Sequence, residues 1–334
     1  MFAEDSMSTI YEVAALAGVS PATVSRVLNG VNVSAEKSRL VRDAAGKLAF
    51  TPNRTARSLR KQSSEVIALV IPDIENPFFT SMARGVEDVA QAAGYSVVLC
   101  NTDEDPDKEA SYLSIAVSEN MAGIILAAAS DHVDLAPLLR RGRPVVAVDR
   151  GPHGFDLDAV MVDNIAGGRE ATQALYDQGF SRIACITGPS DVETAQRREH
   201  GWRQVVIANG GHDERYLKHA NFRVDGGRAA MDELLALETP PDAVFVANNL
   251  MSVGALQVLF ERGLTTENVG MASFGDLPFS TLAPRGVTII HLPARHLGVT
   301  AARLLIERIN GDDQPARTIV LRNEISAPTS VGSA

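Results

Sequence analysis

The amino-acid sequence predicts a small all-α head at residues 1–50, a linker at 51–63, and an α/β body of two lobes at 64–334. Three observations support this fold class. Apolar residues follow a helical spacing in the head, and short continuous apolar runs replace that spacing from residue 66 onward. The body contains more strand-and-helix units than one sheet accommodates. The charge divides at the same place, because residues 1–62 carry a balance of +4 and the rest of the chain carries −14.

The head contains signals for three short helices. Thr9 and Glu12 have the spacing of a capping box at the start of the first helix, and Gly18 suits the left-handed position that ends it. Ser20 is a favourable N-cap for the second helix, and Ser34 is expected to cap the third. The apolar stripe of the third helix is expected to comprise Leu40, Val41, Ala44, Ala45 and Leu48. Three such helices, with a tight turn between the first two, form a helix-turn-helix arrangement.

The outward side of the second helix carries small and polar residues, namely Pro21, Ala22, Thr23, Ser25 and Arg26. Small residues at the start of a helix let it lie deep in the major groove of DNA. Hydroxyl groups there can donate to phosphate oxygens, and Arg26 can reach a guanine edge or a phosphate. The basic balance of the head favours this interpretation, although a helical hairpin with a solvated face remains the alternative.

The linker has a basic composition, with an isolated large apolar residue in it. Asn53 can cap a short helix over residues 54–60, which is too short to be stable alone in water. One interpretation is a solvated linker. The other is a helix that forms on DNA, with Arg57 and Ser58 on the sugar-phosphate backbone and Leu59 inserted between base steps in the minor groove.

The body alternates apolar runs with amphipathic segments. The runs lie at residues 66–71, 95–100, 123–127, 144–149, 182–187, 243–247 and 269–274, and helices are expected between most of them, for example at 79–94 and 249–263. Continuous apolar strands are buried on both faces, and repeated strand–helix–strand units form doubly wound parallel sheets. The body therefore divides into two similar lobes, with the division near residues 160–164.

Two such lobes leave a cleft at the carboxyl ends of their strands, where ligands usually bind. The residues expected at those ends are Asn76, Phe78, Phe79, Asp149, Arg150, Thr194, Arg198, Asn248, Asn249, Asp276 and His291. Polar side chains for hydroxyl groups, a cation and aromatic rings together suit a polar small molecule such as a sugar or a nucleoside.

Other function classes find little support. No dinucleotide, P-loop, nucleophile-elbow or zinc-protease motif is present in the sequence, and no Cys/His spacing indicates a metal, so no cofactor is expected. Cys100 and Cys185 lie in apolar runs and are expected to be reduced core residues. Neither a secretory signal nor a run long enough to span a membrane is apparent, so a cytoplasmic location is expected.

Six segments carry a resemblance to a known family. TIYEVAALAGVSPATVSRVLNG at 9–30, PNRTARSL at 52–59, PDIENPFF at 72–79, VDN at 162–164, ITGP at 186–189 and VAN at 246–248 resemble the LacI-type bacterial transcription regulators. The resemblance covers nearly the whole chain. It implies a ligand-responsive repressor rather than an enzyme, acting as a homodimer on a pseudo-palindromic operator. A solute-binding protein of a transporter and an α/β enzyme are the alternatives.

The resemblance also implies roles for individual residues. Phosphate contacts would come from Tyr11, Ser20, Thr23, Ser25 and Asn29. Base edges would face Pro21, Ala22 and Arg26, with Leu59 as the minor-groove wedge. The body would resemble periplasmic sugar-binding proteins, with an N-lobe of about 64–161 plus 293–321 and a C-lobe of about 162–292 plus 322–334. Effector contacts would come from Phe78, Phe79, Asp149, Thr194, Arg198, Phe222, Asn248, Asp276 and His291. Effector binding would change how the lobes sit, and thereby operator affinity.

Three positions depart from the family pattern. Gly275 and Asn249 replace acidic residues that are common in the family, and His291 stands where Gln is common. These departures predict an effector that is less hydroxyl-rich or more anionic than a plain hexose, such as a sugar phosphate, a sugar acid or a nucleoside. The chain ends in EISAPTSVGSA without leucine heptads, so a dimer is expected rather than a tetramer.

Overall fold

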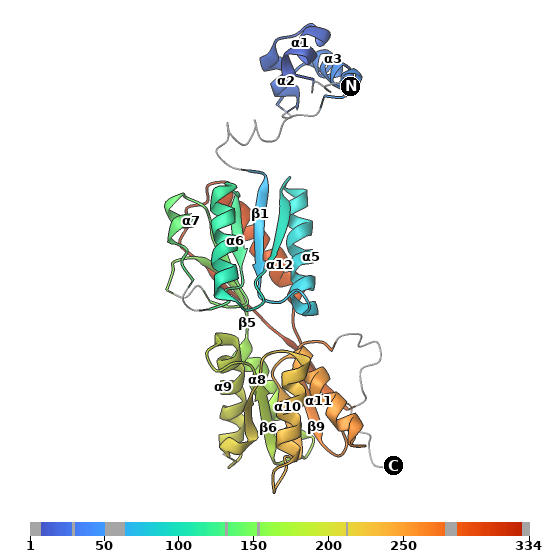
Figure 1. Ribbon diagram of the computed structural model, residues 1–334, viewed down its shortest axis with the longest axis vertical. Coiled ribbons are helices and arrows are strands. Elements are labelled where there is room, and N and C mark those ends of the chain that lie inside the picture. The colour runs from blue at the N-terminus through green and yellow to red at the C-terminus, as the bar shows by residue number, and fades with distance from the viewer. Residues whose placement is uncertain are drawn as a thin grey trace, which may run out of the picture. The chain divides into compact units, whose positions relative to one another are not determined.

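The computed structural model describes residues 8–28, 31–50, 64–130, 133–151, 154–211, 213–277 and 286–328. The chain forms two compact units, residues 1–64 and 65–334. Each unit has its own hydrophobic core. Figure 1 labels the helices and strands of both units.

The first unit is a bundle of three short helices, α1 (Ile10–Ala17), α2 (Pro21–Leu28) and α3 (Ala35–Lys47). The capping box is confirmed: the Glu12 amide donates to the Thr9 hydroxyl, and the Thr9 amide donates to the Glu12 carboxylate. Gly18 adopts the expected left-handed conformation, with φ of 64°. Small apolar side chains from all three helices form the core, namely Val13, Ala14, Ala17, Val24, Val27, Val41 and Ala44.

Two details of α3 differ from expectation. The Ser34 side chain makes no capping hydrogen bond. Leu40 is 37% exposed rather than buried. Val41, Ala44, Ala45 and Leu48 have the spacing of one helical face and contribute to the core, whereas Leu40 precedes that series by one residue. One residue is about 100° around a helix, which carries Leu40 off the buried face.

The N-lobe of the second unit is built on a six-stranded sheet in the order β11-β5-β4-β3-β1-β2, with every pair parallel. Its strands are β1 (Val66–Ile71), β2 (Ser96–Asn101), β3 (Gly123–Leu126), β4 (Val145–Val148), β5 (Asp158–Val162) and β11 (Thr318–Leu321). One face is covered by α5 (Pro77–Ala92) and α12 (Ala294–Ile309), and the other by α6 (Pro106–Ser118) and α7 (Ala136–Arg140). Gly85 and Gly298 let α5 and α12 pack closely, because a Cβ at either would overlap the backbone of the other helix.

The C-lobe repeats this plan with the strand order β12-β10-β9-β8-β6-β7. Its strands are β6 (Ile183–Thr187), β7 (Leu217–His219), β8 (Ala243–Val246), β9 (Gly270–Phe274), β10 (Val287–His291) and β12 (Glu324–Ser326). One face is covered by α8 (Asn164–Asp177) and α9 (Glu193–Ala208), and the other by α10 (Val224–Leu235) and α11 (Asn249–Glu261). A short 3₁₀ helix, η1 (Glu214–Tyr216), precedes β7.

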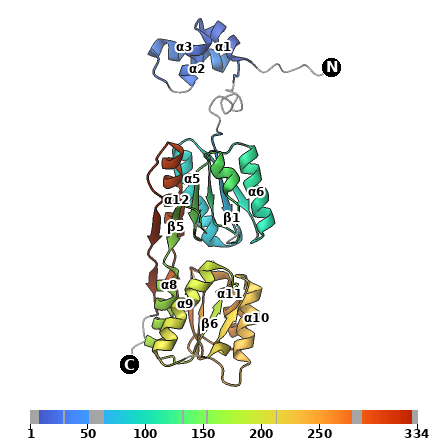
Figure 2. The same cartoon turned by 90° about the vertical axis from the view of Figure 1, so that its left-hand side faces the viewer.

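The chain crosses between the lobes at three places: from β5 to α8, from β10 to α12, and from β11 to β12. The last crossing explains why the C-lobe sheet is not wholly parallel. β11 runs parallel to β5, and the chain continues into β12, which is antiparallel to β10. Because the chain does not reverse between β11 and β12, β12 runs away from the cleft between the lobes. Its neighbour β10 runs toward the cleft, so the two strands are antiparallel. Figure 2 shows this segment, in dark red, passing along both lobes.

Candidate functional site

The exposed face of α2 brings together the residues predicted to contact DNA. Ala22 and Arg26, one helical turn apart, are exposed, while Pro21, Thr23 and Ser25 are half-buried beside them. The Ser20 hydroxyl accepts from the Thr23 amide at 3.2 Å and lies 2.9 Å from the Thr23 hydroxyl. This bond confirms Ser20 as the N-cap and holds the start of α2 in place.

The other predicted DNA contacts are distributed differently. Tyr11, on α1, is 70% exposed, so its ring is available to a partner. The four remaining residues lie outside the described part of the chain: Asn29, Arg57, Ser58 and Leu59.

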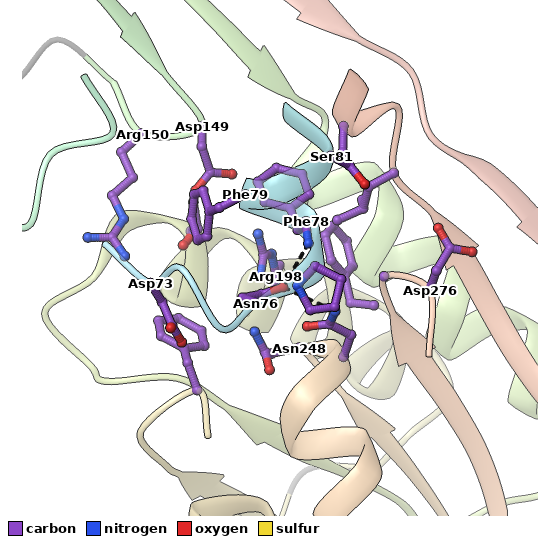
Figure 3. A pocket seen from close by; sticks show the side chains of 18 of the residues that line it. Asp73, Asn76, Phe78, Phe79, Ser81, Asp149, Arg150, Arg198, Asn248 and Asp276 are labelled. Carbon is purple, nitrogen blue, oxygen red and sulfur yellow. Dashed lines mark hydrogen bonds between the residues drawn. The ribbon is translucent and has the colours of Figure 1, made fainter. Parts of the chain in front are cut away.

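Between the lobes lies a cavity of about 370 Å³. All the predicted effector residues except His291 line it, from Asn76 and Phe79 in the N-lobe to Asn248 and Asp276 in the C-lobe. These residues follow the carboxyl ends of parallel strands in both sheets, and such ends meet at the same edge. Figure 3 shows Asp149 and Arg150 at one wall, Asn248 at the other, and Arg198 between them.

Asp149 is the cavity residue in the least favourable electrostatic setting. It is 4% exposed, its backbone is left-handed with φ of 65°, and its buried Oδ1 atom has no hydrogen-bond partner among the residues that the structure describes. Burial raises the pKa of its carboxyl group. Arg198 and Arg150 oppose that shift, and the Glu104 and Glu193 carboxylates add to it. An unpaired buried acceptor and a strained backbone are both typical of a group held for a ligand.

Arg198 is held rigidly beside Asp149. It is 6% exposed and projects from α9. Its Nε donates to Asn164 Oδ1 at 2.8 Å, its Nη1 donates to the Ala247 carbonyl at 2.9 Å, and its guanidinium lies 4.2 Å above the Phe274 ring. Burial lowers the pKa of Arg198 to about 10, against the effect of Asp149, so the side chain stays charged at neutral pH.

Arg150, the second buried cation of the cavity, is already neutralised. Its Nη1 and Nη2 atoms donate to the two carboxylate oxygens of Glu104 at 2.8 and 2.6 Å, and Nη1 also donates to the Ala128 carbonyl. Such a bidentate pair fixes the guanidinium in one plane. Arg150 therefore closes the N-lobe wall and leaves Arg198 as the cation that faces Asp149.

Aromatic rings and amides form the rest of the walls. Phe78 and Phe79 pack edge to face with centroids 5.0 Å apart, and the Phe78 amide donates to Asn76 Oδ1. Phe222 also has a left-handed backbone, with φ of 61°, and its ring occupies the space that a side chain at Gly188 would need. The rings offer flat apolar surfaces for a cyclic ligand.

His291 lies at the carboxyl end of β10, as predicted, and its contact with an effector stays a prediction. It is not among the residues that line the cavity. Its Nδ1 lies 2.5 Å from Asp276 Oδ1, and its Nε2 lies 2.8 Å from the Ser326 hydroxyl on β12. The ring thus contacts Asp276, which lines the cavity, and Ser326 of β12.

Two family models match this chain. "Bacterial regulatory proteins, lacI family" matches residues 9–53, and "Periplasmic binding proteins and sugar binding domain of LacI family" matches residues 64–326. The chain belongs to the LacI family. The family resemblance and the fold class expected from the sequence are both confirmed.

Individual LacI-family proteins are similar over the full length. The HTH-type transcriptional repressor PurR of Aliivibrio fischeri (strain ATCC 700601 / ES114) is 31% identical, over 98% of this chain and 99% of its own. The ribose operon repressor of Escherichia coli (strain K12) is 34% identical, over 91% and 93%. A solved structure of a transcriptional regulator CelR–cellobiose complex is 32% identical with a TM-score of 0.71, over 96% and 98%. These relatives are regulators rather than enzymes, which removes the enzyme alternative.

Several cavity residues of this LacI-family chain were missed by sequence reasoning. They are Asp73, Pro77, Ser81, Glu104, Asn221, Arg223, Phe274, Leu292, Pro293, Ala294 and Arg295. Asp73 and Glu104 follow β1 and β2 and could have been found by the rule that ligands meet strand ends. Asn221 and Arg223 follow β7, a three-residue strand too short to show a hydrophobic pattern.

Two general properties of the LacI-family chain follow from the described residues. Both cysteines, Cys100 and Cys185, are free and buried, as expected of core residues. Within the described ranges, no helix has the length and apolarity of a membrane span, and no cluster of three or more His, Cys, Asp or Glu side chains could hold a metal ion.

Proposed function

We propose that this chain is a transcriptional repressor that binds operator DNA through α2 and binds an uncharged, hydroxylated ring compound, a sugar or a nucleoside, in the interlobe cavity. One observation carries the choice of ligand. The buried, unpaired Asp149 oxygen lies in the same cavity as the buried Arg198 guanidinium. A carboxylate accepts from a hydroxyl group and a guanidinium donates to one, so the pair suits a ligand rich in hydroxyl groups.

The charge balance of the cavity favours a neutral ligand. Among the described lining residues, four carboxylates face four guanidinium groups: Asp73, Glu104, Asp149 and Asp276 against Arg150, Arg198, Arg223 and Arg295. Arg150 is paired with Glu104, and Arg295 with Asp88 outside the cavity. An anionic ligand would need a surplus of buried positive charge to replace its hydration. Of the ligand classes expected from the sequence, sugars and nucleosides are therefore favoured over sugar phosphates and sugar acids.

The names of the relatives agree with this choice without deciding it. One relative is a ribose operon repressor, and one solved relative holds cellobiose. Both names refer to sugars.

The cavity is suited to control the lobe arrangement. Its walls come from both lobes, and the crossing from β10 to α12 contributes Leu292 and Ala294 directly. Arg198 is bonded to Asn164, at the crossing from β5 to α8. A ligand that contacts both lobes and their crossings has a binding free energy that depends on lobe orientation, so it shifts the population of orientations.

We further propose a homodimer that presents two heads to a pseudo-palindromic operator. Strand β2 is at one edge of the N-lobe sheet. It exposes two apolar side chains, Val98 and Leu99, on opposite faces of the strand. An exposed apolar edge of this kind pairs with a partner unless it is protected. A second copy of the chain is the occupant we propose for this edge.

The proposed function is tested by fluorescence anisotropy with labelled DNA from upstream of the protein's own gene. We expect specific binding that weakens steeply as the salt concentration rises, because the head neutralises several phosphates. Arg26→Ala should weaken specific binding. If the full-length protein bound no DNA fragment better than a random one, the DNA-binding part of the proposal would be abandoned.

The ligand class is tested by isothermal titration calorimetry with D-ribose, D-glucose, adenosine and ribose 5-phosphate. We expect at least one neutral compound to bind and the phosphate to bind more weakly. Tighter binding of ribose 5-phosphate, lost in Arg198→Gln, would contradict the neutral-ligand proposal and restore the anionic alternative.

A further inference from the structure

A single carboxylate joins the two walls that carry Asp149 and Arg198. Glu193 is the first residue of α9, in the C-lobe, and its side chain is 18% exposed. Its Oε2 accepts from the Gly151 amide at 2.7 Å, and Gly151 follows Asp149 and Arg150 in the N-lobe. Its Oε1 lies 2.6 Å from Arg197, one turn further along α9. Glu193 is not among the residues that line the cavity.

The identity of residue 151 favours this contact. A Cβ at position 151 would lie 3.1 Å from Glu193 Oε2 and 3.3 Å from Oε1, closer than ordinary contacts. Gly151 does not have a positive φ, so its backbone is open to any residue. Glycine here therefore serves close approach and not conformation, because a Cβ would force the Glu193 carboxylate to shift by a few tenths of an ångström.

The contact brings like charges together. Glu193 is near enough to Asp149 to contribute to the raised pKa of that carboxyl group, after burial and the opposing effects of Arg198 and Arg150. The Gly151 amide and Arg197 offset this repulsion at Glu193 itself. Arg198 and Arg150 act on Asp149 through their charge, but Asp149 Oδ1 accepts no hydrogen bond from the described residues. A ligand hydroxyl that donates to Asp149 would supply one, which ties ligand binding to the interlobe contact.

We infer that Glu193 is a positioning residue of the effector site, which holds the Asp149–Gly151 wall of the N-lobe against the α9 wall of the C-lobe. It acts through Gly151 and does not touch the ligand. The consequence for ligand affinity rests on the proposed function, whereas the contact between the walls does not. The two parts are therefore measured separately.

The contact is tested by hydrogen–deuterium exchange of the ligand-free, full-length protein at single-amide resolution. In Glu193→Ala the amide of Gly151 should exchange about tenfold faster or more, because it loses a charged acceptor. In Glu193→Gln the exchange should stay within about threefold of the unmodified protein, because an amide oxygen still accepts. Gly151→Ala should also speed exchange of the amide at position 151, because the added Cβ would push the Glu193 carboxylate away from it.

Arg197→Gln is the matched control. It removes the ion pair to Glu193, but the Gly151 hydrogen bond does not depend on it, so exchange at Gly151 should change by no more than about twofold. Amides of the buried strand β6 report on the whole fold. If the β6 amides also exchange faster in Glu193→Ala, the whole fold has loosened in that variant. The exchange at position 151 in Gly151→Ala and Glu193→Gln then decides whether the contact exists. Equal protection of position 151 in all variants would overturn the inference.

The effect on affinity is measured with D-ribose and adenosine as probes, through the fluorescence of Trp202, the one tryptophan, which lies on α9. Glu193→Ala should lower the affinity for whichever probe the unmodified protein binds by about tenfold. Glu193→Gln should keep most of that affinity. Unchanged affinity in Glu193→Ala would refute the positioning role. If the unmodified protein binds neither probe, the proposed ligand class fails, and the exchange at Gly151 still decides the contact.

Discussion

At the scale of single residues, the cavity concentrates groups that cost stability. Asp149 combines a buried, unpaired oxygen with a left-handed backbone, and Phe222 adds a second left-handed backbone in the same walls. Such features persist only where the surrounding structure holds them in place, and they gather at ligand sites. These residues lower the stability of the free protein, and we propose that a bound ligand would satisfy the groups responsible.

The first prediction concerns Asp149→Asn. Burial raises the pKa of Asp149, so the charged form is disfavoured in the folded state. This cost is present above the folded pKa and absent below the unfolded value near 3.8. At pH 7 the variant should therefore melt at a higher temperature, with a free energy of unfolding larger by an amount on the order of 1–3 kcal/mol. At pH 3 its stability should equal that of the unmodified protein. Its ligand affinity should fall by about tenfold or more, because the charged acceptor is lost.

Calorimetric melts at both pH values check this prediction. Asn76→Ala serves as a comparison, because it removes a neutral cavity residue and should not raise stability. A lower melting temperature for Asp149→Asn at pH 7 would show that Asp149 is stabilising and not reserved for a ligand.

The second prediction concerns Arg26→Ala on the exposed face of α2. The side chain is exposed, so the head should keep its stability. Specific DNA binding should weaken by about 1–3 kcal/mol if Arg26 reads a base edge. Fluorescence anisotropy on specific and random DNA distinguishes a base contact from a phosphate contact. Equal weakening of binding to both DNAs would assign Arg26 to a phosphate.

At the scale of elements, one buried carboxylate fastens the edge of the N-lobe. Asp158, at the start of β5, accepts from Arg308 Nε and Nη2 on α12 and from the Arg317 amide just before β11. Its side chain is 1% exposed. β5 is distant in sequence from α12 and β11, and Asp158 adds a polar contact to the strand pairing and apolar packing that join these elements. β5 and β11 also lead into two of the three crossings between the lobes.

The third prediction follows from the titration of Asp158. Burial alone would raise its pKa, but the hydrogen bonds from Arg308 and Arg317 outweigh burial and hold the pKa at about 2. A depressed folded pKa gives stability that is complete above the unfolded value of 3.8 and is lost as pH falls through about 2. Asp158→Asn should therefore cost about 2 kcal/mol at pH 7, and the cost should shrink in acid.

Urea unfolding of Asp158→Asn at pH 7 and pH 3 measures this difference. Asp312→Asn is the control, because Asp312 also pairs with Arg317 but is more exposed, so its loss should matter little. An equal cost for Asp158→Asn at both pH values would mean that its charge is not the stabilising feature.

At the scale of the whole molecule, three crossings join the lobes, and we propose that a ligand changes the arrangement of the lobes. The cavity draws residues from both sheets, and its contacts reach the crossings through Arg198 and through Leu292 and Ala294. The proposed ligand site in the body and the proposed DNA-binding face of α2 belong to different compact units. We propose that the dimer carries the coupling between them.

The fourth prediction concerns that dimer. Val98→Asp, on the exposed edge strand β2, should shift the protein toward monomer, because a charge would be buried against the partner. Light scattering at micromolar concentration measures the mass, and operator affinity should fall with it. Ile207→Asp, at an exposed apolar residue of α9, should leave the mass unchanged. A tetramer mass for the unmodified protein would contradict the proposed assembly.

The sequence by itself determined most local structure and the general composition of the cavity. The Thr9 capping box, the left-handed Gly18 and the buried strand at residues 66–71 depend on neighbours in the chain, so their patterns are legible there. The rule that ligands meet strand ends led to Asp149, Arg198 and several other lining residues, although about half of the lining was missed. Short strands such as β7 escaped prediction, because three residues carry too little periodicity.

Only the tertiary structure decided how those side chains are used. Nothing near His291 in sequence indicates that it turns to Asp276 and Ser326, nor does α9 show that Glu193 reaches Gly151. The neutral balance of the cavity also depends on partners such as Glu104, which neutralises Arg150 from 46 residues away. The physical reason is the same in each case: hydrogen bonds and ion pairs act over a few ångströms, and which groups come that close is set by the packing of distant segments.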